Sequence, residues 1–334
     1  YIITMKQNTI ICLVSLFLTT LASCQKADDS ITIENDKLPM SVIARIGDVE
    51  PASARYAGTL PNDVFFTEGD AIGIFMFEKN ADNKGDVAKW THDAMKWGTT
   101  ADVNWPDREK EYTFKAFYPY DDKATYTYTN IPMPSLLGQN GTFESVASRD
   151  FLIASTTQNY GTSGTVVFQG EGKAFNHVSA LVHLTILDSD DLADATLTGI
   201  SIEGGNIVAP SSYSFETSSV TLSPNSNSDL LSTTLTQEMD KDQDYYFVLN
   251  AKSTESNNVK LSIQYTTNGK DYIAESNSFS NNIFTSGKQH NFTVNIKDKQ
   301  LSITEATINP WTDSENTENI IINNPQEFEN EESE

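Results

Sequence analysis

Short segments rich in β-branched and aromatic residues recur along the chain and constrain its fold more than any other feature. Clusters of glycine, asparagine, aspartate, serine and proline separate them, and such clusters favour turns. No long stretch beyond the N-terminal apolar segment has helical periodicity. This pattern is typical of β-sandwiches and predicts an all-β fold. The segments predicted to be strands are residues 71–77, 112–118, 151–154, 165–168, 180–187, 197–202, 245–249, 259–265 and 292–296.

The length of the chain favours two sandwiches rather than one. A chain of 334 residues is too long for one small domain. The acidic turn at residues 188–191 is the best boundary between two halves, and Asn268-Gly269 predicts a β-hairpin in the second half. We therefore expect an N-terminal β-sandwich at residues 59–190, a C-terminal β-sandwich at residues 191–310 and a partly disordered tail at residues 311–334.

Residues 1–23 have the features of a processed export signal. Their apolar core, residues 10–18, is too short to span a bilayer, which needs about 20 apolar residues. Leu21-Ala22-Ser23-Cys24 follows and resembles the lipobox of bacterial lipoproteins, in which the cysteine thiol takes a diacylglycerol. We predict that the signal peptide, residues 1–23, is removed and that Cys24 anchors the chain to the outer membrane at the cell surface. The alternative is that Cys24 is an ordinary buried thiol.

The charge and the cysteine content exclude several classes of partner. The formal net charge is −24, so nucleic acids and anionic lipid surfaces are poor partners. Cys12 lies inside the predicted signal and Cys24 is the predicted lipid site. No cysteine is then left for an intrachain disulfide or a thiolate metal site. A lipid on Cys24 would anchor the chain to a membrane without inserting it.

The sequence has no recognisable catalytic constellation, and we predict neither an enzyme nor a bound cofactor or metal. None of the four histidines stands near a nucleophile elbow or in a metal-ligand spacing. His177 and His183 would share a face if one strand carried both, so a metal pair there stays open as an alternative. Trp90, Trp97 and Trp105 either stack on sugar rings or pack in the protein core.

Five motifs, taken in chain order, resemble those of the fimbrillin family. This family comprises pilus-forming lipoproteins of anaerobic gut and oral Gram-negative bacteria. The motifs are FTEGDAIGIFMF at residues 66–77, YTFKAFYPY at 112–120, DFLIA at 150–154, FNHVSALVHL at 175–184 and INPW at 308–311. In the motif at residues 175–184, Val182 stands where the family has a basic residue.

The resemblance implies two tandem transthyretin-like β-sandwich domains that assemble by strand exchange. In the family, the lipidated precursor reaches the surface with an N-terminal strand that fills its own groove. A trypsin-like or arginine-specific protease cuts behind that strand, which leaves together with the lipid. The open groove then accepts a C-terminal strand from the next subunit.

On this chain the resemblance assigns the removable strand to a leader at residues 24–58. Residues 40–46, MSVIARI, are its strand-like part. Arg55 lies in the small-residue segment PASARYAG, the kind of loop that proteases cut, and is the predicted cleavage site. Arg45 is the second choice for the cleavage site. It lies within the strand-like part, where it would be shielded from a protease. The alternative for Arg55 is an ordinary surface residue.

The candidate donor-strand residues lie near the C-terminus. Leu301 and Ile303 have the spacing that fills one face of a strand. In a regular strand Ile308 would face the opposite side from Leu301 and Ile303, so we expect a bend or bulge near Ala306. A second candidate segment contains Ile320 and Ile322. Head-to-tail strand exchange produces open filaments rather than closed rings.

The resulting prediction is a structural subunit of a cell-surface pilus that is exported as a lipoprotein and polymerises after proteolysis. Its partners would be other pilus subunits, the processing protease and a host or bacterial surface receptor. Two alternatives stay open. One is a tip adhesin or basal anchor of the same pilus, and the other is a surface glycan-binding lipoprotein.

Overall fold

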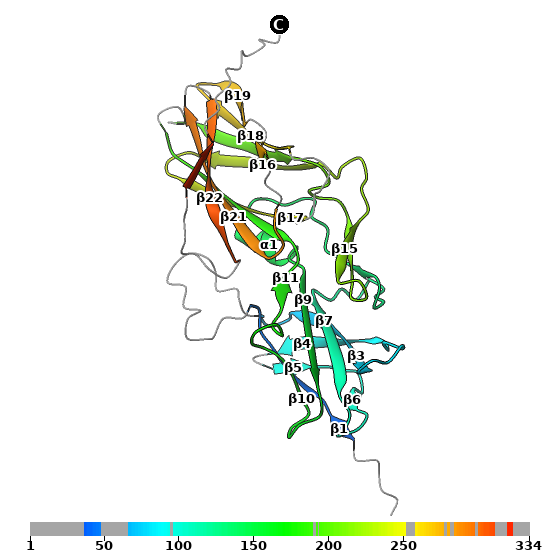
Figure 1. Cartoon of the computed structure of the whole chain (residues 1–334). Coiled ribbons are helices and arrows are strands. Elements are labelled where there is room, and N and C mark those ends of the chain that lie inside the picture. Colours follow the sequence, from blue (N-terminus) through cyan, green and yellow to red (C-terminus); the bar gives the residue numbers. More distant parts are fainter. Residues whose placement is uncertain are drawn as a thin grey trace, which may run out of the picture. The chain divides into compact units, whose positions relative to one another are not determined.

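A computed structural model of the chain is shown in Figure 1. It describes residues 37–47, 66–93, 96–189, 192, 194–251, 258–276, 279–280, 284–297, 300–310 and 319–322, and for residues 258, 279–280, 300, 304–310 and 319–322 it describes only the backbone. Strands dominate these residues, and α1 (Phe143–Ala147) is a single short helix among them. In the part of the chain that the structure describes, no helix is long and apolar enough to cross a bilayer.

The N-terminal half is built on a six-stranded sheet, coloured cyan to green in Figure 1. Its order is β11 (Asn176–His177), β9 (Leu152–Gln158), β7 (Tyr112–Tyr118), β3 (Ala71–Glu78), β4 (Val87–Asp93) and β5 (Lys96–Gly98). Two short pairs accompany it: β1 (Leu38–Pro39) with β6 (Asn104–Trp105), and β2 (Ser41–Ala44) with β10 (Thr165–Phe168).

Both faces of the central strand β3 are buried, which explains its nearly continuous apolar sequence. Ile72 and Ile74 belong to a core that also contains Val42 of β2 and Phe168 of β10. Phe75 belongs to a separate cluster on the other face. That cluster is covered by a small sheet of β8 (Ile131–Pro132), β14 (Ser211–Ser214) and β15 (Ser219–Leu222).

The C-terminal half consists of two sheets that share one hydrophobic core. The first sheet has the order β17 (Gln243–Leu249), β12 (Ala180–Ile186), β21 (Lys288–Lys297), β22 (Gln300–Pro310) and β23 (Asn319–Ile322). The second has the order β16 (Leu230–Glu238), β13 (Thr196–Glu203), β18 (Asn258–Thr267) and β19 (Lys270–Glu275), and β20 (Phe279–Ser280) also pairs with β18. Leu184 and Val294 of the first sheet and Ile202 and Ile263 of the second lie in this core, so the sheets form a sandwich.

The all-β prediction is therefore confirmed, and each of the nine predicted strands overlaps an observed one. The predicted hairpin is also present: β18 and β19 are joined through Asn268 and Gly269, whose φ angles are +51° and +72°. Such left-handed residues match the right-handed twist of the two strands.

The strand pairing bears on the boundary predicted near residue 190. β12 lies before that boundary, yet it pairs antiparallel with β17 and parallel with β21. The chain therefore passes from the six-stranded N-terminal sheet to the first C-terminal sheet between β11 and β12. The division of the chain into two sandwich domains stays a prediction.

Candidate functional site

The leader strand β2 pairs with β10 and adds side chains to the N-terminal core, and Figure 1 shows it in blue beside β10. β2 runs parallel to β10, with Val42 opposite Val166 and Ala44 opposite Phe168. Beyond β2, the amide of Phe175 donates to the carbonyl of Arg45 at 2.8 Å, and the amide of Gly47 donates to the carbonyl of Phe175 at 2.8 Å. The backbone of the leader is thus hydrogen-bonded to the body of the protein from β2 through Gly47.

The side chains of the leader alternate between the core and the solvent. Met40, Val42 and Ile46 are buried, whereas Ile43 is 45% exposed. This period of two is that of a strand with one buried face. Each buried apolar side chain of this size stabilises the fold by roughly 1.5–3 kcal/mol relative to an exposed one. The leader therefore supplies part of the N-terminal core and does not merely cover its surface.

Gly164 brings the leader close to the loop before β10. Its carbonyl accepts hydrogen bonds from the Trp105 indole at 2.8 Å and from the Ser41 amide at 3.3 Å. Its φ angle is +65°, and a Cβ on this residue would lie 2.8 Å from the Pro39 carbonyl oxygen and 2.6 Å from the Tyr160 ring. Only glycine fits this approach without movement of the leader. No local sequence pattern marks Gly164, because its role depends on a strand more than 100 residues away.

A pair of alanine substitutions tests this close approach. Gly161 has a φ angle of +61° in the same loop, but a Cβ there would meet nothing within 4 Å. We expect Gly161→Ala to lower the free energy of unfolding by about 1 kcal/mol, the usual cost of a left-handed alanine. Gly164→Ala should cost about 2 kcal/mol more, because it also overpacks the leader. Chemical denaturation measures both values, and equal losses would contradict a steric role for Gly164.

The four arginines differ in how they are held. The Arg45 amide donates to the Phe168 carbonyl at 2.9 Å, so its backbone is paired on both sides of the residue. The Arg149 guanidinium donates to the carbonyls of Gly138 at 2.9 Å and Ser145 at 3.1 Å. Arg108 is exposed and lies over the Tyr160 ring at 4.6 Å. Arg55, like the predicted lipid site Cys24, lies outside the described residues.

The C-terminal donor candidates occupy two strands of the chain's own sheet. β22 pairs antiparallel with β21, and its residues Leu301 and Ile303 are buried in the C-terminal core. One extra residue of β22 lies between Ala306 and Asn309, relative to its partner, so the bulge expected near Ala306 is present in the stretch that contains Ile308. β23, which contains Ile320 and Ile322, pairs with β22 and ends the sheet.

The aromatic and histidine candidates have structural partners. Trp90, Trp97 and Trp105 are only 2%, 8% and 2% exposed, which removes the main sequence argument for sugar stacking by these residues. His177 lies in β11 and faces the Asp150 carboxylate at 2.8 Å, while His183 lies in β12 and faces the Asp244 carboxylate at 2.8 Å. Within the described ranges, no group of three or more histidine, cysteine or acidic residues is placed to hold a metal ion.

The geometry defines a β-sandwich protein in which an N-terminal strand, β2, pairs with β10 and completes a hydrophobic core. The fimbrillin-like family model matches residues 57–311, and the chain belongs to that family. A search of curated proteins found no match.

Two solved structures from gut bacteria share the fold. A candidate cell adhesion protein of Bacteroides ovatus is 16% identical, with a TM-score of 0.60, and the match covers 84% of this chain and 99% of that one. A candidate cell adhesion protein of Bacteroides uniformis is also 16% identical, with a TM-score of 0.54, and the match covers 83% and 99% of the two chains.

Family membership settles the general class of function. The protein is a pilus-related structural subunit of the cell surface and not an enzyme, and other pilus subunits are among its partners.

Proposed function

We propose that the chain is a structural pilus subunit that is exported as a lipoprotein, with lipid on Cys24, and polymerises by protease-triggered donor-strand exchange. The observation that carries this proposal is the leader strand, which pairs with β10 of its own chain through main-chain hydrogen bonds and buries apolar side chains in its core. Its departure would leave the Phe168 carbonyl and the Phe175 amide without their hydrogen bonds to Arg45 and would expose apolar side chains of the core. A strand from another subunit could satisfy both.

Cleavage after Arg55 would free this leader. The Arg45 backbone is hydrogen-bonded on both sides, so a protease could not easily draw it into an extended conformation. The family match begins at residue 57, two residues beyond Arg55, which supports a processing point between the leader and the body of the subunit. The protease would be trypsin-like or arginine-specific.

The incoming strand would come from the C-terminal end of the next subunit. Leu301 and Ile303 contribute to their own core and their strand is paired with β21, so their release would open the C-terminal sandwich. β23 is the terminal strand of its sheet and pairs with β22 over four residues. We therefore favour the segment with Ile320 and Ile322 as the donor.

Native digestion of the purified precursor with trypsin tests this proposal. We expect loss of the leader up to Arg55, followed by sodium dodecyl sulphate-resistant ladders of subunits. Arg55→Gln should keep the leader and stay monomeric, whereas the matched variant Arg45→Gln should behave as wild type. Intact mass and gel electrophoresis give both readouts.

A truncation after Pro310 separates cleavage from assembly. It should lose the leader as the full chain does but form no ladders, because it lacks β23. Ladders from the truncated chain would move the donor role back to β22. Cleavage of the full chain without ladders would favour a tip or terminal subunit. An intact leader after digestion, with lipid kept on Cys24, would favour a basal anchor and contradict the proposal.

A further inference from the structure

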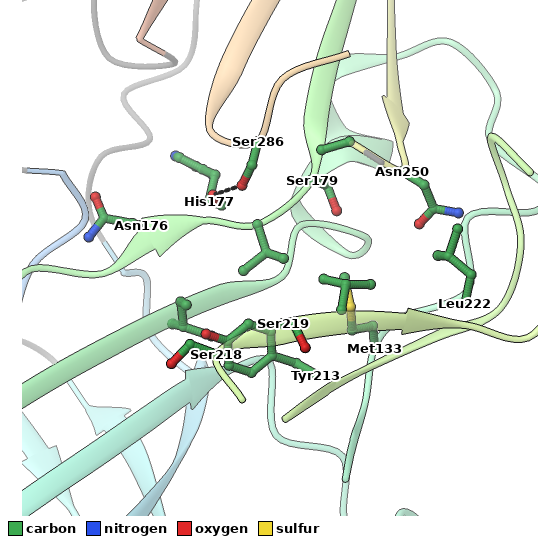
Figure 2. Close-up of a pocket in the computed structure, with 14 residues that line it drawn as sticks. Met133, Asn176, His177, Ser179, Tyr213, Ser218, Ser219, Leu222, Asn250 and Ser286 are labelled. Atoms are coloured by element: carbon green, nitrogen blue, oxygen red, sulfur yellow. Dashed lines mark hydrogen bonds between the residues drawn. The ribbon is translucent and has the colours of Figure 1, made fainter. Parts of the chain in front are cut away.

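A pocket of about 240 Å³ is lined by residues that lie outside the leader, and Figure 2 shows them. Strands β14 and β15 contribute one wall, and the chain segments around Ser179, Asn250 and Ser286 contribute the others. This volume is below the roughly 300–1,000 Å³ typical of pockets for drug-sized ligands. The pocket therefore suits a ligand of about one ring.

Asn250 presents a fixed acceptor to this pocket. The side chain is 3% exposed, and its Nδ2 donates to the carbonyls of Asn206 at 2.8 Å and Ala209 at 3.0 Å. Both amide protons are thereby used, which fixes the orientation of the group. The remaining atom, Oδ1, is buried and has no hydrogen-bond partner.

Ser179 is a second unpaired group in the same pocket. It is 1% exposed and its Oγ has no hydrogen-bond partner. In Figure 2 the oxygens of Ser179 and Asn250 point toward the same space. Leaving a buried polar group unpaired costs about 1–3 kcal/mol, so such groups normally have a partner. Of the buried unpaired side-chain atoms in the described residues, those of Ser179 and Asn250 are the two that line this pocket, so one molecule bound there would pair with both.

The other lining residues define the character of that molecule. None of the described residues that line the pocket is lysine, arginine, aspartate or glutamate, and His177 is paired with Asp150. Apolar and aromatic side chains, among them Met133, Tyr213 and Leu222, form much of the wall. A charged ligand would meet no counter-charge here. A neutral ligand with hydroxyl donors and an apolar face would match both the unpaired oxygens of Asn250 and Ser179 and the apolar wall.

We infer that this pocket binds one neutral sugar unit, a hexose or deoxyhexose, with a sugar hydroxyl donating to Asn250 Oδ1 and another exchanging a hydrogen bond with Ser179. The inference does not depend on strand exchange. Sugar binding is measured by NMR, whereas strand exchange is measured by proteolysis and subunit ladders, so either can fail without the other. It also differs from stacking on the buried tryptophans, which line another part of the molecule.

Saturation-transfer difference NMR on the full chain tests the site with the methyl glycosides of glucose, galactose, mannose, N-acetylglucosamine and fucose. We expect at least one to show transfer at about 10 mM, since a single-ring ligand with few contacts binds in the millimolar range. Ser179→Ala should weaken its binding about fivefold, the equivalent of one hydrogen bond. The same variant should unfold at the wild-type temperature or above, because the hydroxyl it removes has no partner.

A blocking variant and its neighbour supply the control. Leu222→Trp fills the space beside Asn250 and should abolish transfer. Thr221→Trp places the same ring on the next residue of β15, which is exposed and does not line the pocket, and should bind as wild type. Three results would overturn the inference. The first is that none of the five sugars shows transfer, and the second is that transfer is undiminished in both Ser179→Ala and Leu222→Trp. The third is a crystal soaked with the sugars in which only water contacts Asn250 and Ser179.

Discussion

Val42→Asp is expected to release the leader strand from β10. The Val42 side chain is 6% exposed and lies in the core that contains Phe168. Burying an unpaired carboxylate there would cost about 4 kcal/mol or more, the same order as the roughly 3–6 kcal/mol that Met40 and Ile46 together gain, and the substitution also removes the contribution of Val42 itself. The strand should detach from β10 instead, and the hydrogen bonds of Arg45 with Phe168 and Phe175 should open.

Native trypsin digestion measures this release. In the Arg55→Gln background, which keeps the leader attached and Arg45 protected, we expect Val42→Asp to be cut after Arg45 and thermal unfolding of the N-terminal half to shift to lower temperature. Ile43→Asp is the matched control, because it adds the same charge to the next residue of β2, which faces solvent and is 45% exposed. It should change the stability by less than about 0.5 kcal/mol and leave Arg45 protected. Equal cleavage of the two variants would show that the leader is not held by its inward face.

The strands that could be predicted from sequence are those whose side chains are buried. β3, β7 and β12 consist mainly of apolar and aromatic residues, and each places several of them in a core. The hairpin between β18 and β19 was predictable because Asn-Gly has a local preference that does not depend on the rest of the fold.

The strands that were missed carry a weaker local signal. β16 is mostly serine, threonine and other polar residues, and Leu231 is its one fully buried side chain. β4 mixes lysine, histidine and aspartate with Trp90. Both are held by antiparallel partners, β13 and β3, so their structure follows from pairing rather than from composition.

The candidate functional sites also differ in whether a local sequence pattern marks them. The strand β2 was predictable as a strand, because its alternating apolar residues form a local pattern. Its parallel pairing with β10 was not, since the two strands are separated by more than 100 residues. Gly164 and Asn250 act through contacts that only the folded chain creates, so no sequence pattern marks them.

Acidification is expected to destabilise the C-terminal half through His290, the most buried of the histidines. Burial lowers the pKa of the His290 imidazole from its ordinary value of 6.5 to about 4. The ring packs edge-on against Phe284, and Nε2 accepts a hydrogen bond from the Thr285 amide at 3.1 Å. A protonated Nε2 could not accept this bond, so the folded state holds the neutral form.

The pH window follows from the two pKa values. Above pH 6.5 the residue is neutral in both the folded and the unfolded chain and contributes no pH dependence. Between pH 6.5 and about 4 the unfolded chain takes up a proton and the folded chain does not, so the free energy of unfolding falls as the pH falls. The whole effect amounts to about 3 kcal/mol.

Urea denaturation of wild type and His290→Gln between pH 7 and pH 4.5 isolates this contribution. The glutamine keeps an acceptor for the Thr285 amide but cannot titrate, whatever its effect on stability at pH 7. Carboxylates titrate in the same range, so the informative quantity is the difference between the two profiles. We expect this difference to change by about 2 kcal/mol across the range, with wild type losing more stability on acidification. Parallel profiles would mean that the folded chain admits the proton, and thus that the C-terminal core opens around His290 more readily than its burial indicates.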